Sequence, residues 1–246
     1  MVLSDFTVSL IFSEKTSKIP LKYFVFFLGT VCGFPVGALS CERLCAIGAL
    51  DKKSAERLIP VSNSTSPAFV LGALGSSMLG SVQLGALIYI AQTISNLIFL
   101  FPIKIIQRPM SGQPEKEDVL TLFLQAIERA VSSIFRVCAL ICVFSALLSV
   151  LQTYLGNSPI YYIFSALLEI GNGTSICASL FKVNPALSLS LCAFACAWSG
   201  ICVHFQIFSS LKSIKINKIY FVFFKLLQGI LCAVLCWFGY KIFFAA

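Results

Sequence analysis

Residues 29–37 read Gly-Thr-Val-Cys-Gly-Phe-Pro-Val-Gly and lie in the middle of an apolar stretch, residues 21–50. Glycine and proline in such a cluster interrupt a helix. A similar interruption, Glu-Ile-Gly-Asn-Gly-Thr-Ser at residues 169–175, lies within the apolar stretch 160–182. Irregular backbone survives at membrane depth only where protein or a water-filled cavity satisfies its polar groups. Each stretch therefore predicts a re-entrant hairpin, two half-helices joined by a glycine-rich tip.

The composition is that of a membrane protein. Of the 246 residues, 58% are hydrophobic and 11% are charged, and the mean hydropathy is +0.93. A soluble domain usually carries about a quarter of charged residues. Apolar runs long enough to cross a bilayer, roughly 20 residues, recur along the chain, most clearly at 84–106, 130–151, 185–211 and 219–244. The sequence predicts an all-α polytopic membrane protein in contact with the lipid bilayer.

The distribution of Lys and Arg predicts how the chain is oriented. The net charge of +8 does not indicate nucleic acid, because the basic residues form no single patch with stacking aromatics. They lie between the apolar runs, and cytoplasmic loops carry the Lys/Arg excess. One side of the expected topology receives the N-terminus and the basic loops at 51–57 and 212–218. The other side receives Lys182 and Lys241. We therefore expect a cytoplasmic N-terminus and a C-terminus outside.

The helix that follows each hairpin is also interrupted. Residues 62–67 read Ser-Asn-Ser-Thr-Ser-Pro, and residues 198–206 read Trp-Ser-Gly-Ile-Cys-Val-His-Phe-Gln. An intact apolar helix follows each of them. The order of hairpin, broken helix and whole helix thus occurs twice, with opposite entry sides, which predicts two inverted-topology repeats. Unrelated Gly/Pro kinks are the simpler alternative.

These expectations divide the chain as follows. Residues 1–20 form an N-terminal cytoplasmic or interfacial segment. Repeat 1 covers 21–106, with a hairpin at 21–50, a broken helix at 54–80 and a helix at 84–106. A polar cytoplasmic linker covers 107–119. Repeat 2 covers 120–246, with a helix at 126–152, a hairpin at 160–182, a broken helix at 185–211 and a helix at 217–244.

Interrupted helices expose unpaired N–H groups on one half and unpaired C=O groups on the other, and their dipoles place partial charge at the break. Interruptions that meet at mid-membrane would form a polar pocket for a small anion or another hydrogen-bonding solute. The expected function is that of a transporter or permease-like gate. The alternative is a non-transporting scaffold or a subunit of a membrane complex.

The interrupted segments resemble a known family. Residues 27–38, together with Ala-Glu-Arg-Leu at 55–58 and the run at 62–69, are similar to the sporulation integral membrane protein YlbJ (SpoVV) family of the nucleoside-recognition or gate domain group. Residues 168–173 and 199–206 resemble it more weakly. The resemblance implies a bacterial cell membrane, such as a forespore membrane, and dipicolinic acid as the transported solute. It also implies an architecture similar to that of concentrative nucleoside transporters.

Members of this family carry further helices before the first hairpin, where about twenty residues stand here. Repeat 1 therefore has no counterpart to the apolar run 130–151. One expectation is therefore a homo-oligomer or a membrane partner that supplies the missing helices. The other is a reduced form that acts by itself.

Polar residues at the interruptions are the candidate solute-binding residues: Asn63, Ser64, Ser66, Glu169, Asn172, Thr174, Ser199, His204 and Gln206. The expected hairpin tips contain Gly33, Pro35, Gly37, Gly171 and Gly173. An ionisable residue deep in a membrane segment is a functional candidate by default. Glu169 is thus expected to accept a hydrogen bond from the solute or to carry a proton; its structural alternatives are pairing with Arg136 or with N–H groups of the tip.

His204 is the one histidine of the chain, and it is either a proton carrier or a hydrogen-bond partner between helices. We expect no enzymatic activity: Ser199 and His204 lie on one broken segment, and no GxSG motif or phosphate-binding loop occurs. We expect no cofactor and no metal site, because the cysteines, largely spaced at i,i+4 in apolar helices, are typical of helix packing. The coupling ion, H+ or Na+, stays open.

Overall fold

The structure is a computed structural model that describes residues 20–105 and 119–244. Within these ranges the fold is all-helical, without strands. Four of the helices are long and apolar enough to cross a membrane, which makes the chain an all-helical membrane protein as predicted; they are Val82–Leu100, Phe123–Leu155, Pro185–Ser210 and Lys218–Phe243. The expected segments 1–20 and 107–119 lie almost entirely outside the described residues.

The first half of the chain begins with two short antiparallel helices. Helices α2 (Leu21–Cys32) and α3 (Val36–Ala46) are joined at Gly33, whose φ of 80° is the left-handed conformation that glycine adopts without strain. A broken helix follows, with α4 (Lys52–Ser62) and η1 (Ala68–Met78), the latter wound as a π-helix. Helix α5 (Val82–Leu100) is continuous.

The second half repeats this order after one additional helix, α6 (Val119–Leu155). Helices α7 (Pro159–Leu168) and α8 (Ile170–Ser179) form the second pair, and a short turn, η2 (Leu180–Lys182), follows. The next helix is interrupted between α9 (Pro185–Trp198) and α10 (Gly200–Ser210). Helix α11 (Lys218–Phe243) is continuous and packs on α9 and α5.

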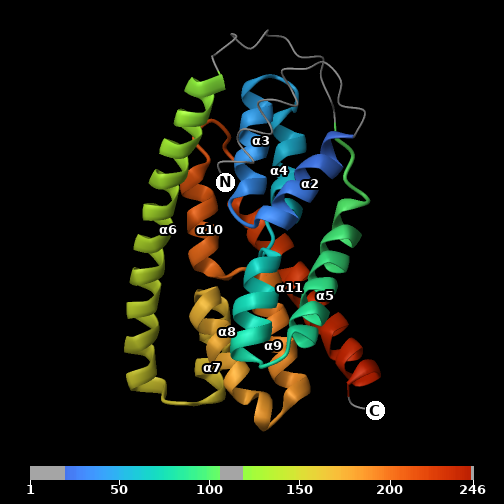
Figure 1. Ribbon diagram of the computed structural model, residues 1–246, viewed down its shortest axis with the longest axis vertical. Helices are drawn as coiled ribbons and strands as arrows, with labels where there is room; N and C mark the ends of the chain where they lie inside the picture. The colour runs from blue at the N-terminus through green and yellow to red at the C-terminus, as the bar shows by residue number, and fades with distance from the viewer. Residues whose placement is uncertain (1–19, 106–118, 245–246) are drawn as a thin grey trace.

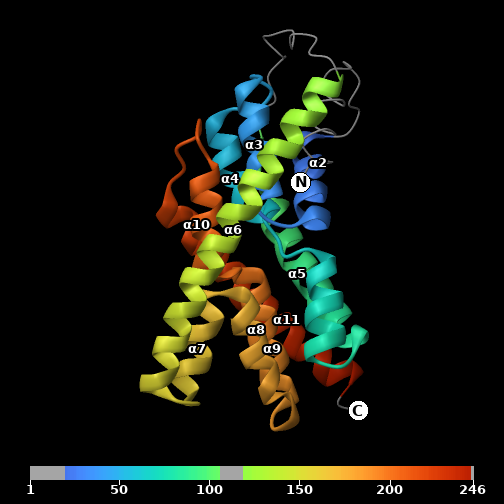
Figure 2. The same cartoon turned by 60° about the vertical axis from the view of Figure 1, so that its left-hand side comes forward.

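The two helix pairs lie at opposite ends of the molecule (Figure 1). The pair α2/α3 shares one end with α4 and α10, and the pair α7/α8 shares the other end with α9. Both broken helices are therefore interrupted near mid-length, while α6 runs along one side over most of the long axis (Figure 2). This arrangement brings interruptions that are far apart in sequence to the same level.

Two helix boundaries differ from the sequence-based expectation. Helix α5 ends at Leu100 instead of near residue 106, because Pro102 has no backbone N–H to continue the helical hydrogen bonds. Helix α6 begins at Val119 instead of residue 126, so that it extends beyond its apolar run. It packs on α7 and α10, and many of its large apolar side chains, including Phe135 and Val143, are exposed.

Glycines let the first helix pair close tightly on the broken helix. A Cβ atom built on either Gly29 of α2 or Gly37 of α3 would overlap the backbone carbonyl oxygen of Ser62. Both arms of the pair therefore contact the last residue of α4 without an intervening side chain. Close backbone approach of this kind is typical of helix packing in membranes.

We predict that Gly29→Ala destabilises the folded protein, because its methyl group cannot enter the space held by the Ser62 carbonyl. Overpacking of this kind costs about 1–3 kcal/mol. Gly72→Ala on η1 is the matched control, because a Cβ there meets no atom within 4 Å. Thermal unfolding in detergent, followed by tryptophan fluorescence, should show a lower midpoint for Gly29→Ala and not for Gly72→Ala. Equal midpoints for the two variants would contradict this packing.

Candidate functional site

The interruption of the first broken helix, residues 63–67, is here called break 1. Its polar residues Asn63, Ser64 and Thr65 are 0–1% exposed. Asn63 ends α4: its Nδ2 donates to the Ile59 carbonyl at 2.7 Å, and its Oδ1 accepts from the backbone N–H of Ala38 at 3.3 Å. Break 1 is thus tied to the helix before it and to α3.

Side chains from α5 and α11 bind three consecutive residues of break 1. Lys225 Nζ donates to the Asn63 carbonyl at 2.9 Å. Asn96 Nδ2 donates to Ser64 Oγ at 2.6 Å, and Gln92 Nε2 donates to the Thr65 carbonyl at 3.0 Å. These three side chains, which we call the clasp, are 0–1% exposed. The clasp satisfies polar groups that the interrupted helix cannot pair by itself.

The clasp also holds polar atoms that have no hydrogen-bond partner among the described residues. These atoms are Gln92 Oε1 and Asn96 Oδ1, together with both amide atoms of the neighbouring Gln228 on α11. Ser95 Oγ, between the two clasp residues of α5, donates to the Gln228 carbonyl at 3.0 Å. A buried amide oxygen without a partner costs about 1–3 kcal/mol. Such atoms beside break 1 mark a place suited to a polar ligand.

The second interruption, residues 199–200, is called break 2. Ser199 and Gly200 have φ values of 72° and 75°, and Ser199 is fully buried. A serine in the left-handed region stores backbone strain, which concentrates at functional sites. A Cβ on Gly200 would lie 3.1 Å from the Leu168 carbonyl oxygen and 3.2 Å from the Ile170 nitrogen. Break 2 therefore lies directly against the tip between α7 and α8.

Glu169 forms the N-cap of α8 at this tip. Its Oε1 accepts from the Gly171 N–H at 2.8 Å, and its Oε2 accepts from the N–H and the Nδ2 of Asn172 at 2.7 and 2.9 Å. A carboxylate at a helix N-terminus stabilises the helix through its N–H groups and its dipole. This contact matches the structural alternative of pairing with the tip. Arg136 instead donates to the Ser209 carbonyl at 3.2 Å.

The other residues predicted near the second hairpin and break 2 are bound mostly within their own segments. Asn172 Nδ2 also donates to Ser145 Oγ on α6 at 2.7 Å, and Thr174 Oγ1 donates to the Ile170 carbonyl at 2.7 Å. His204 Nε2 lies 3.0 Å from the Trp198 carbonyl, and its ring contacts Trp198 and Phe221. The histidine thus holds the end of α9 against α10 and α11.

Three further predicted residues differ in how their polar groups are used. Ser66 Oγ accepts from the Phe69 N–H at 3.4 Å at the start of η1. Ser199 Oγ donates to the Cys196 carbonyl at 3.4 Å. Gln206 Nε2 donates to Cys202 Sγ at 3.4 Å, while its Oε1 has no partner among the described residues. Of these three, Gln206 keeps a free buried acceptor.

A direct hydrogen bond joins the two broken helices. Thr65 Oγ1 in break 1 donates to the Cys196 carbonyl at 2.8 Å, near the end of α9 that leads into break 2. The two residues are 131 positions apart in sequence. The breaks therefore form one buried polar region in the middle of the molecule.

Of the predicted residues, Asn63, Ser64 and Ser199 have contacts in this region, and several residues that contact them were not predicted from the sequence. The missed residues lie on the two whole helices and in break 1: Thr65, Gln92, Ser95, Asn96, Lys225 and Gln228. A signal was present, since a lysine or several amides inside an apolar membrane span are rare and usually face the protein interior.

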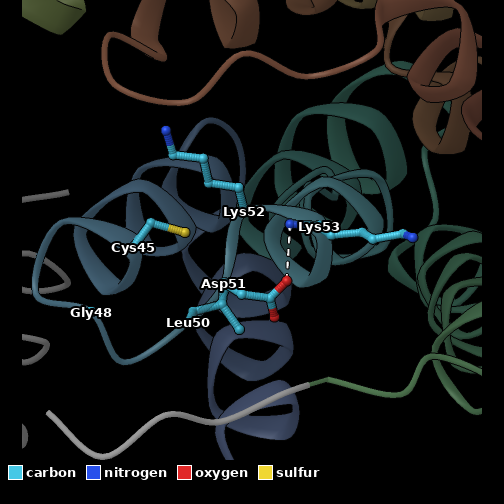
Figure 3. A pocket seen from close by; sticks show the side chains of 6 residues that line it. All are labelled: Cys45, Gly48, Leu50, Asp51, Lys52 and Lys53. Carbon is cyan, nitrogen blue, oxygen red and sulfur yellow. Dashed lines mark hydrogen bonds between the residues drawn. The ribbon is translucent and has the colours of Figure 1, made fainter.

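Two surface cavities lie apart from the breaks. A cavity of about 380 Å³ is lined by residues 45–53, between α3 and α4 (Figure 3). Asp51 there accepts from the Lys53 N–H and caps α4. A second cavity, of about 710 Å³, is lined by α3, α6 and α10 and includes Arg136. No break residue lines either of these two cavities, and Asn63, Ser64, Thr65 and Ser199 are 0–1% exposed.

The cysteines are free thiols, and their settings differ. Cys192 and Cys196 on α9 and Cys232 and Cys236 on α11 are buried where these helices pack. The pair at 138 and 142, expected in a packing face, is exposed on α6, because that helix contacts few neighbours. Within the described residues, no group of three or more His, Cys, Asp or Glu side chains could hold a metal ion.

Comparison of the chain with known proteins finds no family model, no curated protein and no solved structure that matches it. The resemblance to the YlbJ family therefore stays a prediction carried by the quoted residues.

We predict that Thr65→Val weakens the contact between the two broken helices. Valine has nearly the same shape but cannot donate to the Cys196 carbonyl, which would keep only the longer hydrogen bond from Ser199 Oγ, at a cost of about 0.5–1.5 kcal/mol. The control is Thr93→Val, since Thr93 donates to the Tyr89 carbonyl within its own helix. Thermal unfolding should show a larger loss for Thr65→Val. An equal or smaller loss than for Thr93→Val would contradict a link between the breaks.

Proposed function

We propose that this protein is a gated membrane transporter that moves a small polar or anionic solute between its two broken helices. The observation that carries the proposal is the Thr65–Cys196 hydrogen bond, which joins break 1 to the end of α9 within one buried polar region. Broken helices that meet at mid-membrane are the usual place of solute sites in transporters built from inverted repeats.

The element order supports an inverted repeat. A helix pair, a broken helix and a whole helix occur twice, and the two pairs enter from opposite ends of the molecule (Figure 1). We propose that both pairs are re-entrant hairpins whose tips support the breaks. Their short lengths fit this proposal, because a helix of 10–12 residues is too short to cross a bilayer.

The polar groups between the breaks favour a solute with negative charge or hydrogen-bonding groups. Lys225 brings a positive charge, Gln228 brings an unpaired donor and an unpaired acceptor, and the clasp amides bring unpaired acceptors. The Glu169 carboxylate is bound by three N–H donors of its own tip, and these donors partly offset its negative charge. Dipicolinic acid, the solute implied by the family resemblance, is an anion of suitable chemistry.

A scaffold is the second candidate, favoured by the exposed apolar length of α6. A scaffold, however, has no need for buried amide atoms without partners, and these atoms destabilise the protein unless a ligand or water pairs with them. We therefore place transport first, with H+ or Na+ as the expected coupling ion of such a protein.

The proposed orientation is testable, and contacts at one end support it. Glu42 and Glu56 accept from backbone N–H groups at Ser213 and Asn217, both at 2.6 Å, which gathers two basic loops at the end of α3 and α4. We predict that reporter fusions place Lys52 and Lys215 in the cytoplasm and Asn157 and the C-terminus outside. Locating Asn157 and Lys215 on the same face of the membrane would remove the inverted repeat.

Transport itself is testable with terbium ions sealed inside vesicles that carry the purified protein. Terbium luminescence rises when dipicolinate binds, so the rate of the rise reports entry. We predict uptake above that of protein-free vesicles, and a fall of about tenfold for Ser64→Ala, which removes the acceptor of Asn96. Ser76→Ala is the matched control, because Ser76 is exposed on the same broken helix.

No uptake by the wild-type protein would exclude dipicolinate as the solute. Uptake by Ser64→Ala at the rate of Ser76→Ala would exclude the region between the breaks as the route. Competition by other small anions in the same vesicles would then widen the solute class.

A further inference from the structure

Lys225 lies beside break 1, and its position bears on which coupling ion the protein binds. Lys225 is fully buried on α11, inside a helix long and apolar enough to cross the membrane. Its ammonium donates to the carbonyl of Asn63, the residue that ends α4. Among the described residues it has no carboxylate partner; the titratable groups that act on it electrostatically are His204 and Cys232.

The carboxyl end of a helix is where a cation is stabilised. The last carbonyl groups of α4 have no partner within the helix, and the helix dipole adds partial negative charge there. In transporters with broken helices, unwound carbonyls and the carboxyl ends of half-helices coordinate the coupling Na+ or receive the coupling proton. Lys225 thus delivers a tethered positive charge to the place where such proteins bind a free ion.

Side chains that bind the same break, or neighbour those that do, carry unpaired oxygens of the kind that a cation binds. The amide nitrogens of Gln92 and Asn96 donate to break 1, and their amide oxygens have no hydrogen-bond partner among the described residues. Gln228 Oε1 also has no partner there. Neutral amide and carbonyl oxygens are ligands of hard cations. With Lys225 present, a second positive charge in this buried place would be repelled strongly.

We propose that Lys225 is a built-in cation that takes the place of a coupling metal ion at break 1, so that the protein binds no Na+ there. Break 1 then binds the ammonium of Lys225 in place of a free ion. Removal of that ammonium uncovers a site for an alkali-metal cation, lined by the Asn63 carbonyl and the unpaired amide oxygens. The idea of a coupling role rests on the proposed transport function, whereas ion binding at break 1 does not.

The test measures thermal unfolding of the purified full chain in detergent, in sodium, potassium and choline chloride at equal ionic strength. An ion that binds the folded state raises the unfolding midpoint. The wild-type midpoint is expected to be the same in all three salts. Lys225→Ala is expected to unfold at a lower temperature in choline chloride and to regain several degrees in sodium or potassium chloride.

Two control variants keep the test decisive. Lys225→Arg retains the charge and is expected to have the same unfolding midpoint in all three salts, like the wild-type protein. Lys241→Ala removes an exposed lysine from the same helix and is expected to show no salt-specific change. If Lys225→Ala yields no folded protein, the wild-type protein and Lys225→Arg still test the proposal. A higher unfolding midpoint of either protein in sodium chloride than in choline chloride overturns it.

The proposal also fails if folded Lys225→Ala has the same unfolding midpoint in all three salts, whatever its stability relative to the wild-type protein. Failure of dipicolinate uptake leaves these unfolding measurements unchanged, so the transport proposal and the ion proposal fail separately. Where uptake occurs, replacing sodium by choline outside the vesicles is expected to leave the wild-type rate unchanged, and a sodium requirement for uptake by the wild-type protein contradicts the built-in cation.

Discussion

An interrupted helix in an apolar surrounding must find partners for its free backbone groups, and the structure is arranged around this requirement at break 1. The carbonyl groups of Asn63 and Thr65 accept hydrogen bonds from Lys225 and Gln92. Water cannot take their place in a bilayer, where each unsatisfied group costs several kcal/mol. The polar side chains of α5 and α11 are therefore necessary for α4 and η1 to be separate helices.

The same requirement explains how the helix pairs are used. The arms of α2 and α3 reach the carbonyl of Ser62 because Gly29 and Gly37 have no side chains in the way. At the other end, Glu169 satisfies the first N–H groups of α8, and Gly200 lets break 2 lie against that tip. Each pair thus lies against the break that follows it in sequence, through Gly29 and Gly37 at Ser62 and through the tip between α7 and α8 at Gly200.

The carbonyl groups of Asn63 and Thr65 are paired, but several buried side-chain atoms near them are not. Gln92, Asn96, Gln206 and Gln228 keep buried amide atoms without partners among the described residues. A protein that needed these side chains for support alone would be more stable with every atom paired. Paired carbonyl groups beside unpaired amides favour the proposed solute site over an ordinary kink in a membrane helix.

The sequence by itself determined the helical membrane class and the places where helices are interrupted, since hydropathy and Gly/Pro clusters act locally. It also indicated Asn63 and Ser64 of break 1 and Gly33 between α2 and α3, whereas Gly37 lies inside α3 and Gly171 and Gly173 lie inside α8. Only the tertiary structure decided that Glu169 caps its own helix and that Lys225 lies at the end of α4, because a hydrogen bond between residues 162 positions apart depends on how α11 packs. Periodicity indicates which face of a helix is polar, but the partner of that face is chosen by packing.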